Sequence, residues 1–182
     1  QAGQDLTPIE ALGKTVRHFF PDWEQWVRRL LDGRDVRYTD YDPPRLLWVG
    51  ILVFCLKIGS RRQIRFESNT PTAGKNLQLL CGDGQLAVPH PDTLEYYLRL
   101  LPPAELDRLR RWMIHRLIRM KLLDDQRVEG AFLIVFDGTG QLTFQQRHCP
   151  HCLTRKSGDK VIYYHTVLEA KLVTPSGLAF SI

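Results

Sequence analysis

A short segment around residue 150 gathers side chains that can bind a metal ion. Cys149 and Cys152 form a CxxC pair, His148 and His151 lie beside them, and His165 follows 13 positions after Cys152. Two thiolates separated by two residues can hold one zinc ion, and a histidine further along the chain can supply a third ligand. His148 or His151 would then complete a tetrahedral site. The segment 148–165 therefore predicts a zinc-binding excursion between strands.

Two other interpretations of these residues stay open. Common zinc patterns contain a second CxxC or a closely spaced pair of histidines later in the chain, and this sequence has neither. The five side chains can therefore also lack a metal. A redox-active CxxC needs a helix that begins directly after it, whereas the surrounding sequence is rich in strand-forming residues, so redox chemistry is the weakest of the three.

Asp137 is a candidate ligand for a hard cation. It follows six consecutive apolar residues, 131–136, which is typical of a central strand covered on both faces. A carboxylate at the end of such a strand would be held rigidly beside a cleft, where it could bind magnesium. The simpler interpretation is that Asp137-Gly138-Thr139-Gly140 is a hairpin turn that Asp137 only shapes.

A positively charged stretch can contact nucleic acid. Residues 99–121 contain seven Arg and Lys residues against Glu105 and Asp107. Arg108, Arg111 and Arg119 share one predicted helical face, and cations in such a stripe suit phosphate contacts. Arg61 and Arg62 add a second basic point near a helix start. The alternative is that both clusters are ordinary solvated surface.

The elements that must position these residues change in character along the chain. Thr7-Pro8-Ile9-Glu10 predicts a capping box and a helix to about residue 20. Further helices are predicted at 22–32, 43–58, from 61, at 92–100 and at 103–123, with a helical turn at 76–80. Strands are predicted at 131–136, 142–147, 161–173 and 178–182. The chain should therefore be an α+β (mixed α/β) protein, with a helical region 1–128 and a sheet region 129–182.

Composition limits the class of protein. The chain has 182 residues, 43% hydrophobic residues, four Trp and a formal net charge of +5. This composition favours a packed core and is compatible with a nucleic-acid partner. The longest apolar run, 46–58, is shorter than a membrane span and contains Lys57, so we expect no membrane association. Four Cys residues do not make a disulfide scaffold, and we expect a reducing cytoplasm. Cys55 reads as a core residue and Cys81 as part of a loop.

From Phe132 onward, three segments in order carry a family resemblance. The segments LIVFDGTG, RHCPHCL and YYHTVLEAKLVTPSG resemble insertion-sequence transposases of the DDE type. The upstream segment LLWVGILVFCLKIGSRRQ is similar to the helical region before the catalytic core of those proteins. The resemblance covers roughly residues 40–182.

The resemblance implies the first strands of an RNase H-like core. Asp137 would be the first catalytic Asp and a shared ligand of two Mg²⁺ or Mn²⁺ ions, and the HCPHCL segment with His165 would form an excursion stabilised by zinc. The family's second Asp and its Glu follow the first three strands, and no residue up to Ile182 corresponds to them. We therefore expect this piece to be inactive alone and to leave residues 131–136 without all their neighbours.

The partners implied are DNA, at transposon ends and target, and a second copy of the enzyme in a homodimer. Two other functions stay open. One is a basic helical domain with a zinc knuckle that binds nucleic acid without cutting it, and the other is a transposon-derived interaction protein.

Overall fold

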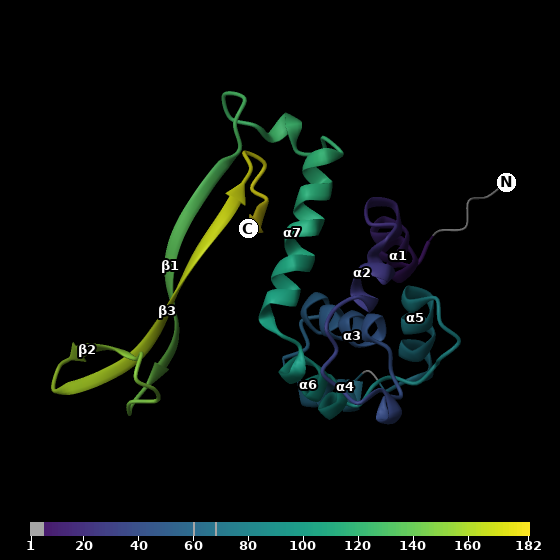
Figure 1. Cartoon of the computed structure of the whole chain (residues 1–182), viewed down its shortest axis with the longest axis horizontal. Coiled ribbons are helices and arrows are strands. Elements are labelled where there is room, and N and C mark those ends of the chain that lie inside the picture. Colours follow the sequence, from purple (N-terminus) through teal and green to yellow (C-terminus); the bar gives the residue numbers. More distant parts are fainter. Residues whose placement is uncertain (1–5, 60, 68) are drawn as a thin grey trace. The chain divides into compact units, whose positions relative to one another are not determined.

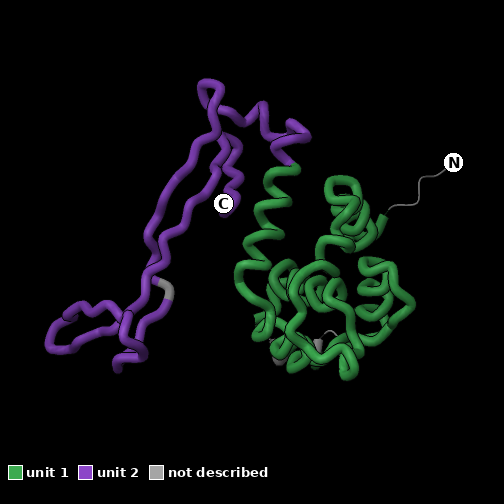
Figure 2. Tube along the Cα trace, in the orientation of Figure 1, with its two compact units in different colours: residues 1–116 green, residues 117–182 purple. Residues whose placement is uncertain are grey.

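The helices and strands divide between two parts of the chain. The structure is a computed structural model that describes residues 6–59, 61–67 and 69–182. Helices come first and an antiparallel sheet follows, so the predicted mixed α/β class is confirmed (Figure 1). Two compact units result, Gln1–Arg116 and Leu117–Ile182 (Figure 2). They meet inside a helix, twelve residues before the boundary expected from the change in sequence character.

The helical unit is built from short helices with well-marked starts. The helices are α1 (Pro8–Phe19), α2 (Trp23–Arg28), α3 (Pro43–Cys55), α4 (Arg61–Glu67), α5 (Pro71–Cys81), α6 (Pro91–Leu100) and α7 (Pro103–Arg119), with a 3-10 turn at Val36–Tyr38. A further 3-10 turn, Asp124–Gln126, follows α7 in the sheet unit. Five of the seven described helices begin with proline, whose missing N–H is not needed in a first turn. The Thr7–Glu10 capping box is present as predicted, with the Thr7 N–H donating to Glu10 Oε2 at 2.8 Å.

Two helix starts differ from the prediction. α5 extends over eleven residues rather than one turn, because Thr70 caps it by accepting a hydrogen bond from the Ala73 N–H. α6 is capped by His90, whose Nδ1 accepts from the Asp92 N–H, and not by Asp92 itself. α7 ends at Arg119, four residues before the predicted end.

A buried arginine organises the core of the helical unit. Arg45 in α3 is 0% exposed and pairs with both carboxylate oxygens of Asp83. Nη1 also donates to the carbonyl of Ala87, at 2.8 Å, and Nη2 to the carbonyl of Gln85, at 2.6 Å. A guanidinium can be buried only when its donors are satisfied in this way. Arg45 therefore fixes the loop between α5 and α6 to the centre of the unit.

Gly74 in α5 makes the same loop fit closely. A Cβ atom on Gly74 would lie 2.1 Å from the Leu86 carbonyl oxygen, so only glycine allows the loop backbone to approach the helix this closely.

Aromatic contacts complete the unit. Trp23 in α2 packs against Trp48 in α3, and Trp26 stacks on Trp112 of α7 with ring centroids 4.9 Å apart.

The sheet unit has one long central strand. Its strands are β1 (Leu133–Phe144), β2 (Leu153–Ser157), β3 (Lys160–Val173) and β4 (Ala179–Ser181). β3 pairs with β1, β2 and β4, and every pairing is antiparallel. The predicted strands at 161–173 and 178–182 are confirmed, whereas β2 was not predicted.

The predicted turn at residues 137–140 is wrong. β1 runs through these residues, with Asp137 opposite Glu169, and the separate strand expected at 142–147 is the end of β1. A tight hairpin turn needs positive φ, which the described glycines adopt at 82, 130, 158 and 177 but not at 138 or 140. The long β3 supplies a partner for the whole of β1, so the strand continues past the Asp-Gly pair with an irregularity between Gly140 and Leu142.

The apolar run 131–136 is not covered on both faces. Leu133, Ile134 and Val135 are exposed, and the Phe136 side chain is 68% exposed. Among the described strands β1 pairs with β3 alone, so β1 lies at an edge of the sheet. This position fits the expectation that residues 131–136 lack some of their neighbours.

In the described part of the chain, no helix is both long and apolar enough to cross a membrane.

The buried Arg45 gives a stability prediction. Asp83→Ala should destabilise the chain by about 3–5 kcal/mol, because it leaves a buried guanidinium without its carboxylate. Asp107→Ala is the matched control, since it breaks the solvent-exposed pair with Arg110 and should cost less than about 1 kcal/mol. Chemical denaturation of both variants gives the two values. Equal destabilisation would show that Arg45 does not organise the core.

Candidate metal centre

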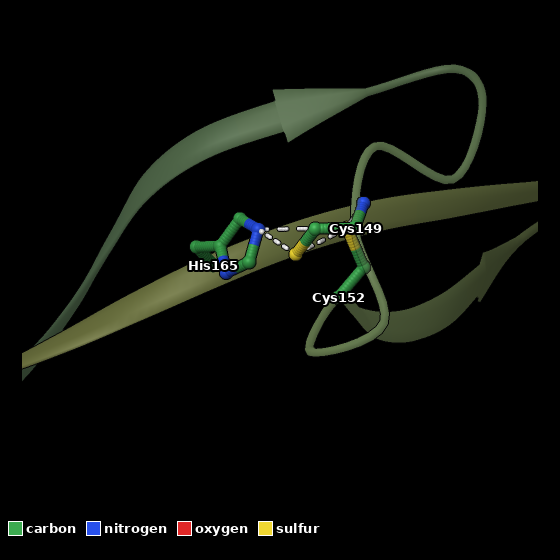
Figure 3. A group of neighbouring side chains, drawn as sticks. All are labelled: Cys149, Cys152 and His165. Atoms are coloured by element: carbon green, nitrogen blue, oxygen red, sulfur yellow. Dashed lines mark hydrogen bonds between the residues drawn. The ribbon is translucent and has the colours of Figure 1, made fainter.

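Three of the predicted metal ligands lie together in the sheet unit. The Sγ atoms of Cys149 and Cys152 are 3.8 Å apart, and the His165 Nε2 atom is 3.3 Å from the first and 3.4 Å from the second (Figure 3). Cys149 and His165 are half-buried and Cys152 is buried. The three atoms therefore form a small triangle of the donors that zinc prefers.

Local backbone structure positions this triangle. Cys149 and Cys152 lie in the connection between β1 and β2, where the Cys152 N–H donates to the Cys149 carbonyl. This tight turn brings the two sulfur atoms to the same side. His165 lies on β3 opposite Leu142 of β1, and its ring points toward the turn (Figure 3). The cluster therefore joins the β1–β2 connection to the central strand.

The triangle has the dimensions of a tetrahedral zinc site. With Zn–S near 2.3 Å, Zn–N near 2.0–2.1 Å and tetrahedral angles, the sulfur atoms should lie about 3.8 Å apart and each sulfur about 3.5 Å from the nitrogen. The observed separations differ from these values by about 0.2 Å or less. The same sulfur separation is far too long for a disulfide, and both cysteines are free.

The surroundings of Cys152 favour the thiolate that a metal requires. Burial raises the pKa of this thiol, but hydrogen bonds from the backbone N–H groups of Cys149 and His148 lower it, with a smaller contribution from the positive charge of Arg147, and the result is a lowered pKa. β2 follows the CxxC directly, so the helix N-terminus that a redox pair needs is not there.

The other two histidines of the segment lie outside the triangle. Both are exposed, and the His148 ring packs edge-on against Phe144 with centroids 4.7 Å apart. His148, predicted as a fourth ligand, is not part of the group that the described side chains form. The structure thus brings together Cys149, Cys152 and His165 and leaves His148 beside them.

Asp137 lies on the polar part of one sheet face. Its exposed carboxylate accepts a hydrogen bond from the Thr139 hydroxyl at 3.2 Å. Residues paired across strands share a face, so Glu169 lies on the same side; it forms an ion pair with Lys171 at 3.2 Å and accepts from the Ser181 hydroxyl. The register that places Glu169 opposite Asp137 follows from the continuous strand β1.

The predicted basic residues of α7 interact with other groups of the chain. Arg108 forms an ion pair with Glu105 at 2.5 Å and donates to the Arg29 carbonyl. Arg111 donates to the Asp107 carbonyl. Arg119 also has an interaction within the chain. The side chains of Arg61 and Arg62 lie outside the described ones, although α4 begins at Arg61.

A second basic group, which sequence reasoning missed, lies on the β2–β3 hairpin. Arg155 and Lys156 belong to β2 and Lys160 begins β3, and all three side chains are exposed. None of them forms an ion pair with a carboxylate in the part of the chain that the structure describes. The available signal was the sequence LTRKSGDK, a short strand followed by a Gly-Asp turn.

Comparison with known proteins gives no relative for this chain. No protein-family model, no curated protein and no solved structure matches it.

The four cysteines should differ in reactivity toward a thiol reagent such as iodoacetamide. Cys55, predicted in the core, is exposed at the end of α3 and should react first. Cys81, predicted in a loop, is buried at the end of α5, and burial raises its pKa to about 12, so it should be unreactive in the folded chain. Mass spectrometry of labelled peptides measures the order. Rapid labelling of Cys81 under native conditions would contradict this account.

Proposed function

We propose that Cys149, Cys152 and His165 bind one zinc ion that stabilises the sheet unit. The observation that supports this is the close match between the three donor separations and a tetrahedral Zn²⁺ site. Two thiolates and an imidazole select zinc over magnesium or manganese, which prefer oxygen ligands. The role is structural: a metal at this position holds the β1–β2 connection against β3.

We further propose that the chain is part of a DNA transposase of the DDE type. The support is the order of the three sequence segments that resemble this family, together with a sheet in which Asp137 is carried by the first strand and faces solvent. Three antiparallel strands at the start of the sheet are compatible with the beginning of an RNase H-like core. The proposal makes Asp137 the first metal-binding carboxylate of the enzyme and DNA its substrate.

The chemistry proposed is phosphoryl transfer on DNA. In such a reaction two Mg²⁺ or Mn²⁺ ions activate water or a 3′-hydroxyl and stabilise the leaving oxygen. A carboxylate shared between the ions must be accessible and held by regular backbone, and Asp137 meets both conditions in β1. The second Asp and the Glu of the family have no counterpart among residues 1–182. A homodimer is part of the same proposal.

A second function is favoured by the exposed cations of the β2–β3 hairpin. A module with these residues and a zinc ion would bind nucleic acid without cutting it. The two functions differ in one respect: only the transposase depends on Asp137.

Metal binding by the purified chain is the first test. Cobalt should bind in a one-to-one ratio with the visible absorption of a tetrahedral thiolate site, and zinc should displace it. Cys152→Ser and His165→Ala should weaken binding by roughly 100-fold or more, because each removes a direct ligand, while Cys55→Ser and His148→Ala should keep it. Affinity should fall as the pH is lowered, because protons compete for the thiolates and the imidazole. Equal binding by Cys152→Ser and the unaltered chain would contradict the site.

The catalytic proposal is tested in the complete protein encoded by the reading frame that contains this chain. Divalent-metal-dependent nicking of plasmid DNA should fall about 100-fold or more in Asp137→Asn, with DNA binding retained. The metal ions that stabilise the developing negative charge would lose a carboxylate ligand. Asp125→Asn, an exposed acid in the same unit, is the control and should nick normally. Normal nicking by Asp137→Asn would show that Asp137 is a strand residue without a catalytic role.

A further inference from the structure

The end of the sheet beyond β1 is a two-stranded ribbon. β1 ends at Phe144, which pairs with Tyr163 of β3, so the three residues Lys160, Val161 and Ile162 have β2 as their neighbouring strand (Figure 1). The ribbon therefore consists of the pairs Arg155–Ile162, Lys156–Val161 and Ser157–Lys160, closed by a turn at Gly158, which has φ of 59°. Residues 153–161 are all exposed.

The ribbon carries positive charge on both faces. Residues directly opposite one another share a face and successive residues alternate, so Arg155 and Lys160 lie on one face and Lys156 on the other. Arg155 also lies over the Tyr164 ring at 5.6 Å, which orders its guanidinium without neutralising it. Asp159 in the turn is the one acidic residue between positions 145 and 165.

The pair Asp137–Glu169 and the ribbon cations lie at different positions along β3. Glu169 and Asp137 form one pair of the ladder, and Lys160 lies nine residues from Glu169 on the same strand. Nine residues of extended strand span about 30 Å. The pair Asp137–Glu169 and the ribbon therefore occupy separate parts of the sheet, and none of the ribbon cations forms an ion pair with a described carboxylate.

We propose that the β2–β3 ribbon inserts into a groove of duplex DNA and contacts the phosphates on both sides of it. A two-stranded ribbon fits the major groove of B-DNA, and cations on both faces match the two phosphate rows that border a groove. The polar turn, Gly158-Asp159, argues against an anionic membrane, which would favour an apolar tip. The metal centre lies at the base of the ribbon, because Cys152 immediately precedes β2 and His165 lies one residue after the last β2-paired residue of β3. This inference rests on DNA being the substrate in the proposed function.

The test compares two triple variants of this chain that change the net charge equally. Arg155→Gln/Lys156→Gln/Lys160→Gln removes the ribbon cations, and Lys14→Gln/Arg65→Gln/Lys75→Gln removes three exposed cations of the helical unit. Binding to a fluorescent 20-base-pair duplex is measured by anisotropy across a salt series. The ribbon variant should lower the slope of log affinity against log salt by about three. The helical variant should leave the slope within about one.

Controls separate the possible failures. Zinc content and circular dichroism verify that each variant is folded, and Lys156→Arg/Lys160→Arg should bind as the unaltered chain does, since the charges are kept. If both triple variants lower the salt-dependence slope equally, or the ribbon variant does not lower it, the ribbon does not contact phosphates. DNA binding by the chain still stands in that case. If the unaltered chain fails to bind DNA, the proposed function fails together with this inference. Stronger binding to anionic lipid vesicles than to DNA would overturn the choice of partner.

Discussion

The cluster of Cys149, Cys152 and His165 is the contact that joins the β1–β2 connection to β3 in the sheet unit. Few side chains are buried there: among the described residues 117–182 the buried ones are Leu123, Cys152, Leu172 and Thr174. A unit with so small a core gains little from the hydrophobic effect. A metal ion supplies binding free energy that becomes folding free energy. The cluster is also the point where the β1–β2 connection, β2 and β3 meet, so the ribbon inherits its orientation from this one site.

The two units use arginine in different ways. In the helical unit guanidinium groups hold structure: Arg45 fixes a loop from inside the core, and Arg34, also buried, pairs with Asp32 and donates to the Tyr41 carbonyl. Arg108 is likewise engaged with Glu105. In the sheet unit the cations of the ribbon have no carboxylate partner among the described residues. A count of basic residues in the sequence does not distinguish these uses, whereas the presence or absence of a partner does.

Local signals in the sequence predicted the helices well. The Thr7–Glu10 capping box and the prolines at helix starts act within one turn, so they can be recognised without knowing the fold. The mixed α/β class and the long strand β3 were also predicted from local patterns of residue type. The candidate metal ligands were recognisable from residue type, but only the antiparallel pairing of β1 with β3 decides which histidine meets the two sulfur atoms.

The errors arose where a distant partner overrides a local preference. Asp137-Gly138 is a common turn pair, yet β3 offers a continuous partner strand, and the turn is replaced by extended backbone. The apolar run 131–136 has the composition of a buried strand, although its burial depends on neighbours that composition cannot supply. Cys55, predicted in the core, is exposed, and Cys81, predicted in a loop, is buried. A residue at a helix end can face either solvent or the core, and sequence alone does not decide between them. The ribbon cations were missed because their exposure follows from where β1 ends.

Hydrogen exchange with and without a chelator tests directly whether a bound metal ion stabilises residues 145–165. Mass spectrometry would follow amide exchange in the zinc-loaded chain, in the chain after zinc removal, and after zinc is restored. Removal of the metal should accelerate exchange in residues 145–165 and leave α3 and α5 unchanged, and zinc should reverse the effect. Unchanged exchange in residues 145–165 after complete removal of the metal would contradict it.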